Sequence, residues 1–178
     1  MPNKDKKNAT SAEREAPAGR NAPGVTEGMR AFVSDTYMLL AKTQSCHWNM
    51  RGPDFIGLHK LTEEQYNELF VAVDELAERI RALDELAPNS VREMMELSRL
   101  EELSAAPSTA EVIDILAADN QAMAGRAKEL AEEADEAGDP ATHDMLAARV
   151  EAHQKAAWLL RAHHPHGNGR STTAMAGR

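Results

Sequence analysis

The 178-residue sequence has little of several features that mark other kinds of protein. With one cysteine it cannot form an internal disulfide, which agrees with a reducing compartment. Aromatic residues make up only 4% of the chain, and no run of β-branched residues alternates as a strand does. No apolar segment approaches the length that spans a bilayer, and the amino terminus lacks a signal peptide's hydrophobic stretch. These absences predict a cytoplasmic, helical protein without a membrane anchor.

The charge that is present is unevenly distributed. Residues 1–24 carry a net charge of +2 and residues 161–178 carry +3. Because the whole chain carries −9, the body between these tails carries −14. An acidic body attracts cations, whereas basic tails can attract phosphate. The composition predicts a disordered basic tail over residues 1–24, one helical domain over 25–163, and a flexible tail over 164–178.

Apolar residues at spacings of three and four predict the first two long helices. The first ends near Met50, before Gly52-Pro53, and its buried face carries Met29, Val33, Tyr37, Leu40, Gln44 and His47. The second is capped by Asp54 and ends at Pro88, with an apolar seam of Tyr66, Leu69, Val73, Leu76, Ile80 and Leu83.

The second half of the chain predicts a short helix and two more long ones. The short helix falls within Val91–Leu100, before Pro107. Ser108 and Glu111 have the spacing of a capping box, after which Val112, Leu116, Met123, Ala127, Leu130 and Ala134 form the third long helix. Gly138-Asp139-Pro140 ends it, and Leu146, Val150, His153, Ala157 and Leu160 mark the fourth. The pattern predicts an all-α four-helix bundle with a short extra helix in its middle connection.

Two pairs of candidate metal ligands lie on the second helix. His59 and Glu63, and likewise Asp74 and Glu78, are four residues apart, so each pair shares a helix face. Glu63 and Asp74 are separated by about 16 Å along the axis, at about 1.5 Å per residue. Because metal–ligand bonds are about 2 Å long, one straight helix cannot bring both pairs to one ion. A second, antiparallel copy of the helix could, which predicts a metal site shared between two molecules.

Other interpretations of these residues remain open at this point. Asp and Glu at four-residue spacing usually form a solvated helix face. Cys46 could be a soft metal ligand or a small core residue, and His153 could be a ligand or a hydrogen-bonded core histidine. Intrabundle di-iron proteins carry Glu-x-x-His on two helices, and this sequence has no such motif, which argues against a centre buried inside one bundle. Imidazole with carboxylate ligands suits iron.

Two blocks of residues resemble the DNA-protection-during-starvation (Dps) family of mini-ferritins, over about residues 26–163. The first block is His47-Trp48-Asn49-x-x-Gly52-Pro53-x-Phe55, then Leu58-His59, Glu63-Glu64-Gln65-Tyr66, Asp74-Glu75 and Ala77-Glu78-Arg79-Ile80-Arg81. The second is Gly138-Asp139-x-x-Thr142 with His153-Gln154-Lys155-x-Ala157-Trp158-Leu159-Leu160-Arg161-Ala162. The resemblance implies a ferritin-like fold, assembled as a hollow dodecamer.

The resemblance also implies a ferroxidase centre that binds two Fe(II) ions at each twofold interface. His47, His59 and Glu63 would come from one subunit, and Asp74 and Glu78 from its neighbour. Hydrogen peroxide is the expected oxidant in preference to oxygen, with ferric mineral stored in the cavity; zinc, manganese or cobalt could compete with iron. Many members carry Asp in place of Glu63. Trp48 would intercept oxidising equivalents or serve as a buried packing residue.

Iron entry and DNA binding are the remaining implied activities. Asp135, Asp139 and Asp144 are candidates for an acidic pore at a threefold axis, with a solvated helix end as the alternative. Sequence-independent DNA binding, and with it a nucleoid association, would depend on the tail residues Lys4, Lys6, Lys7, Arg14 and Arg20, helped by Arg170 and Arg178. The alternative function is a non-enzymatic DNA-packing or structural shell protein with an inactive metal site.

Overall fold

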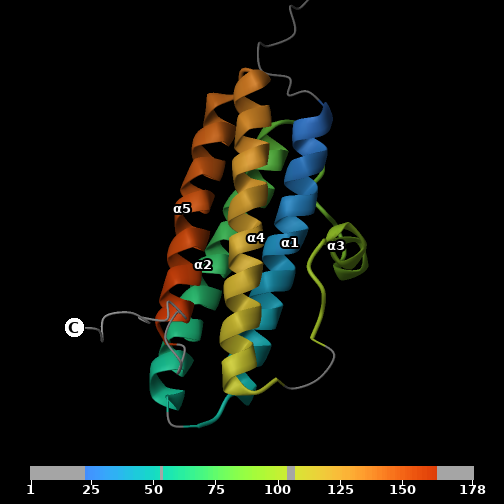
Figure 1. The fold of residues 1–178 in the computed structure, drawn as a ribbon. Coiled ribbons are helices and arrows are strands. Elements are labelled where there is room, and N and C mark those ends of the chain that lie inside the picture. The colour runs from blue at the N-terminus through green and yellow to red at the C-terminus, as the bar shows by residue number, and fades with distance from the viewer. Residues whose placement is uncertain (1–22, 53, 104–106, 164–178) are drawn as a thin grey trace, which may run out of the picture.

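Helices form all of the regular secondary structure in the described part of the chain. A computed structural model describes residues 23–52, 54–103 and 107–163. The helices are α1 (Pro23–Asn49), α2 (Phe55–Ala82), α3 (Val91–Leu97), α4 (Thr109–Glu136) and α5 (Pro140–Ala162). The four long helices run side by side in Figure 1, and the short α3 stands off next to α1. The predicted bundle with a short extra helix is confirmed. No helix in this part of the chain is long and apolar enough to cross a membrane.

Most of the core of the bundle is made by predicted apolar positions, but Phe32, Leu39, Leu58 and Ile113 were not among them, and the predicted Tyr37, Tyr66, Val73 and Val150 are only half-buried. α1 packs against α2, and α4 packs against α5. The largest completely buried side chains are Phe32, Met29, Leu39, Leu58, Leu76, Ile80, Ile113, Leu116, Met123, Leu146, Leu160 and His153. Each buried apolar side chain of this size contributes about 1.5–3 kcal/mol relative to an exposed one. Packing of these faces, rather than helix propensity alone, therefore stabilises the long helices.

Local capping signals place the start of α4 and of α5 correctly. The Ser108 Oγ accepts a hydrogen bond from the Glu111 backbone N–H, and the Glu111 carboxylate accepts one from the Ser108 N–H at 2.7 Å. The hydrogen bonds from Ser108 hold the pKa of the Glu111 carboxyl below its ordinary value. Asp139 caps α5 by accepting from the Thr142 N–H at 3.1 Å, and Pro140 is the first helical residue. The capping box and the stop-and-restart signal are thus confirmed.

The end of α2 lies six residues before the position that the sequence predicted. The helix ends at Ala82 rather than at Pro88 because Asp84 has a positive φ of 64°. The backbone N–H of Glu85 then bonds to the Ile80 carbonyl at 3.3 Å, and that of Asp84 to the Arg81 carbonyl at 3.1 Å. These two bonds form a Schellman motif, with Asp where glycine is usual. The predicted cap at the other end is also wrong in detail, because the Asp54 side chain makes no cap hydrogen bond.

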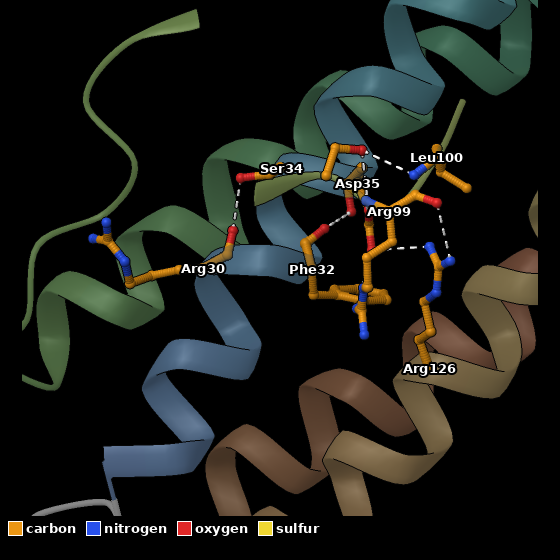
Figure 2. Close-up of polar contacts among 9 residues, drawn as sticks. Arg30, Phe32, Ser34, Asp35, Arg99, Leu100 and Arg126 are labelled. Carbon is orange, nitrogen blue, oxygen red and sulfur yellow. Dashed lines mark hydrogen bonds and ion pairs between the residues drawn. The ribbon is translucent and has the colours of Figure 1, made fainter. Parts of the chain in front are cut away.

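A buried carboxylate holds the segment after α3 against the bundle. Asp35 on α1 is completely buried, and its Oδ2 accepts from the guanidinium groups of Arg99 and Arg126, both at 3.0 Å. Its Oδ1 accepts from the Ser98 hydroxyl and from the Arg99 N–H. Figure 2 shows the two arginines converging on Asp35. α3 itself has no buried residue, and its Glu93 carboxylate pairs with Arg30 on α1.

Candidate metal centre

His47 and His59 meet at the corner where the end of α1 reaches the start of α2. Their imidazole rings stack with centroids 3.7 Å apart and an angle of 15° between the planes. Two aromatic side chains enclose the pair. Phe55 stacks on His59 at 4.7 Å, and Tyr66 contacts His47 edge-on at 5.2 Å. The structure thus brings together two histidines that the sequence placed twelve residues apart.

Each histidine is held by the backbone of the other. Nδ1 of His47 lies 2.9 Å from the carbonyl oxygen of His59, and Nδ1 of His59 lies 3.2 Å from the carbonyl oxygen of His47. A carbonyl oxygen can only accept, so it favours the proton on Nδ1 in both rings. The other ring nitrogen, Nε2, has no hydrogen-bond partner in either ring among the residues that the structure describes. Metal-bound histidines commonly share this arrangement, in which one N–H is fixed by an acceptor and the other nitrogen is free.

The three candidate carboxylates lie on the outside of the single chain. Glu63, Asp74 and Glu78 are exposed on α2, and Phe70 between them is 68% exposed. Seam residues on the same helix point inward instead, with Leu69, Leu76 and Ile80 buried. Over residues 23–52, 54–103 and 107–163, no group of three or more His, Cys, Asp or Glu side chains is placed to hold a metal ion. The donor set fits iron, but one chain supplies only parts of it.

The residues next to His47 separate clearly by exposure. Trp48 is 67% exposed, so in the single chain it is not the buried packing tryptophan that was one alternative. Cys46 is buried and unpaired, and burial raises the pKa of its thiol to about 11. Cys46 belongs to the hydrophobic core cluster of the bundle. The interpretation of Cys46 as a small core residue is therefore confirmed.

His153, by contrast, belongs to the core. Its Nδ1 lies 2.9 Å from the Asn120 side-chain oxygen and its Nε2 lies 3.3 Å from Nη2 of Arg149. Arg149 in turn forms a bidentate ion pair with Glu68 on α2. Burial, with a smaller effect of the Arg149 charge, lowers the pKa of His153 to about 3. His153 is thus a neutral, hydrogen-bonded core histidine, which is one of the two interpretations that the sequence left open.

The three pore candidates differ in their surroundings. Asp135 and Asp144 are exposed, and Asp144 lies 3.1 Å from the His143 ring. Asp139 is buried, pairs with Arg79 at 2.7 Å and caps α5, so its carboxylate is already engaged within the subunit. Asp135 and Asp144 are the exposed candidates of the three.

Some predicted residues fall outside the description, and some described ones were missed. The DNA-tail candidates Lys4, Lys6, Lys7, Arg14, Arg20, Arg170 and Arg178 lie outside the described residues. The buried hydroxyl of Thr62 was missed, although it lies 3.2 Å from Nδ1 of His47. Its position four residues after the buried Leu58 was the available signal. Asp35 was also missed; its spacing from Phe32 and Leu39 places it on the buried face of α1.

Most of this chain is similar in sequence and fold to known proteins. The ferritin-like domain family matches residues 29–167. An uncharacterised low-temperature-induced protein of Nostoc is 33% identical over 141 residues, which cover 78% of this chain and 79% of that protein. A DNA protection during starvation protein of Brevibacillus brevis is 33% identical over 130 residues, covering 73% of this chain and 87% of that protein.

Solved structures show the same relationship. An X-ray structure of Dps from Thermosynechococcus elongatus matches with a TM-score of 0.78 and 27% identity, over 85% of this chain and 95% of that one. The match therefore includes nearly the whole of that subunit. Sequence and fold agree, and the chain belongs to the ferritin-like superfamily and, within it, to the Dps family of mini-ferritins.

Proposed function

We propose that this protein is a ferroxidase and iron-storage mini-ferritin that oxidises Fe(II), preferably with hydrogen peroxide, and stores the ferric product inside a hollow dodecamer. The observation that carries this proposal is the His47 and His59 pair. Both rings present an unpaired Nε2, and α2, the helix that carries His59, has Glu63, Asp74 and Glu78 on its exposed surface. Such nitrogens and carboxylates are the ligands that iron takes in oxygen-activating proteins.

The site would be completed by a second copy of the chain. His47, His59 and Glu63 would come from one protomer, and Asp74 and Glu78 of the partner subunit would face them across a twofold axis. Two features support this arrangement: the described part of one chain holds no group of three ligands, and the stripe on α2 is exposed together with Phe70 and Trp48. An interface would bury both aromatic side chains, which would remove apolar surface from water.

The chemistry follows from the donor set. Two Fe(II) ions would each give one electron to hydrogen peroxide, whose O–O bond breaks to give two hydroxide ions. Carboxylates are hard ligands that favour Fe(III) over Fe(II), and five protein ligands for two ions leave positions open for the oxidant. Glu63 has a longer arm than the Asp of many relatives and would set the second metal position differently. Zinc, manganese and cobalt would compete, because they bind the same nitrogen and oxygen ligands.

A ferrous-iron assay tests the proposal. Fe(II) and peroxide are mixed with the protein, and the absorbance of the ferric product is followed. The double variant Asp74→Ala, Glu78→Ala should lose most of the rapid phase. A matched control is Glu64→Ala, Glu75→Ala, which removes two exposed carboxylates from the same helix and should oxidise iron at the parent rate. Equal rates in parent and ligand variant would leave the alternative, a shell protein with an inactive metal site.

Sequence-independent DNA binding is the second proposed activity. It rests on the +2 charge of residues 1–24, which twelve copies would multiply, against a body of −14 that repels phosphate. Binding should weaken steeply with salt, because it would depend on counterion release. Deletion of residues 1–24 should abolish the gel shift at low salt. An unchanged shift would remove this tail from the DNA-binding surface.

A further inference from the structure

Thr62 is a completely buried threonine in direct contact with the proposed metal centre. Its hydroxyl oxygen lies 3.2 Å from Nδ1 of His47, 2.8 Å from the carbonyl oxygen of Leu58 and 3.1 Å from that of His59. It is one turn after His59 and next to Glu63, yet its side chain faces the core while Glu63 faces solvent. The hydroxyl therefore contacts His47 from the core side of the bundle.

Counting hydrogens fixes the direction of these bonds. The hydroxyl has one hydrogen, which it donates to a carbonyl of its own helix, and it keeps lone pairs that can accept. Nδ1 of His47 carries a proton because it faces the His59 carbonyl. That N–H accordingly has two acceptors, the carbonyl and the Thr62 hydroxyl, whereas Nδ1 of His59 has one, the carbonyl of His47. Of the two histidines, His47 is the more firmly held.

We propose that Thr62 is a positioning residue of the metal centre, whose hydroxyl fixes the orientation and tautomer of His47 so that Nε2 stays unprotonated and available to a metal ion. The inference rests on the proposed function in treating His47 as a ligand. Without the hydroxyl, only the His59 carbonyl still favours the proton on Nδ1, so the share of the competing form with the proton on Nε2 rises. That form cannot bind metal through Nε2 until it loses the proton.

Three substitutions isolate the hydroxyl. Thr62→Val removes it and keeps the branched shape, and Thr62→Ser keeps it and removes a methyl group. Thr36→Val is the matched control, because Thr36 is also completely buried and its hydroxyl donates to the carbonyl four residues earlier, at 2.7 Å, but it has no contact with His47. Calorimetric titration of the assembled, metal-free protein with zinc should show about tenfold weaker binding for Thr62→Val, the low end of what outer-shell partners contribute. Thr62→Ser and Thr36→Val should bind as the parent does.

A spectroscopic readout separates positioning from general loosening of the fold. In ¹⁵N-histidine spectra of the metal-free protein, the neutral ring of His47 should carry its proton on Nδ1 in the parent and in Thr62→Ser. Thr62→Val should show a mixture of the two tautomers. Parent-like spectra and parent-like zinc affinity in Thr62→Val would overturn the proposal, as would a Thr62→Ser variant that binds as weakly as Thr62→Val.

Failure of the proposed function gives a different pattern. In that case the Asp74→Ala, Glu78→Ala variant would bind zinc as the parent does. The spectra alone would then decide whether Thr62 positions His47. A tautomer mixture confined to Thr62→Val would still support the hydroxyl as the group that positions His47. Identical spectra for parent and Thr62→Val would overturn it.

Discussion

His47 and His153 are both buried on the inner faces of helices, yet they differ in what their second ring nitrogen does. Both nitrogens of His153 are engaged, by Asn120 on α4 and by Arg149 on α5. Only Nδ1 of His47 is engaged, and Nε2 has no partner in the described part of the chain. Burial alone therefore does not distinguish a ligand from a core histidine. The number of nitrogens with partners does, because a metal needs a free lone pair.

Their surroundings differ in the same sense. His153 lies inside the bundle, in a network that reaches Glu68 on α2 and contacts the ring of Phe32 edge-on. His47 lies at the corner between α1 and α2, next to the exposed Trp48 and stacked on His59 of α2. The first site stabilises one folded chain, and the second leaves a ring nitrogen free for the proposed metal ion. Each prediction below changes one side of this contrast.

The largest expected effect is the loss of stability when His153 is replaced. His153→Ala leaves a cavity and takes away the partners of Asn120 and Arg149. Together these should lower the free energy of unfolding by about 3–5 kcal/mol, measured by denaturant titration. Zinc affinity at the proposed centre should stay within about twofold of the parent. If the free energy of zinc binding fell by as much as the free energy of unfolding, His153 would not differ from His47 in its role.

The reverse pattern is expected for His47. His47→Ala removes one nitrogen ligand, so zinc affinity should fall about 100-fold, which is about 2.7 kcal/mol. Stability should fall by only about 1 kcal/mol, for the hydrogen bonds that link α1 to α2 at this corner. Calorimetry and denaturant titration on the same samples measure both quantities. A stability loss equal to that of His153→Ala, with zinc binding retained, would assign His47 to the core.

The pH dependence of stability should reflect His153 as well. Its folded pKa of about 3 lies below the ordinary value of 6.5, so between these values the unfolded chain binds a proton that the folded chain does not. Stability should therefore be complete above about pH 6.5 and fall as the pH drops toward 3, by up to about 1.4 kcal/mol per pH unit from this group. Denaturant titrations from pH 7 to 4 should give a flatter curve for His153→Gln. Parallel curves would mean that His153 is protonated in the folded protein.

The sequence predicted those parts of the molecule that depend on neighbours along the chain. Spacing gave the buried faces of the long helices, and the residue pattern at Ser108 and at Asp139 gave their caps. Contacts between distant residues were not visible in this way. Asp35 pairs with Arg99 and Arg126, which lie 64 and 91 positions away, and nothing local marks the three as partners.

The same limit applies to the proposed metal centre. Helical spacing identified the ligand candidates on α2, and family resemblance added His47. Which nitrogen of His47 is free depends on the carbonyl of His59 and the hydroxyl of Thr62, and their positions follow from how α1 meets α2. Similarly, no residue pattern predicted the end of α2 at Ala82, because a positive φ such as that of Asp84 is much less common for aspartate than for glycine.

The smallest expected effect tests that turn, which is outside both histidine sites. Asp84→Gly should raise the free energy of unfolding by about 0.5–1 kcal/mol, because glycine adopts φ near 64° without steric cost. The matched control is Asp54→Gly, the same substitution at an exposed helix terminus with a φ of −92°, where glycine should give no gain. Zinc affinity should not change in either variant. A higher free energy of unfolding for Asp54→Gly, or a lower one for Asp84→Gly, would show that the aspartate side chain rather than the backbone angle determines the effect. A change in zinc affinity would show that this turn is coupled to the corner at His47.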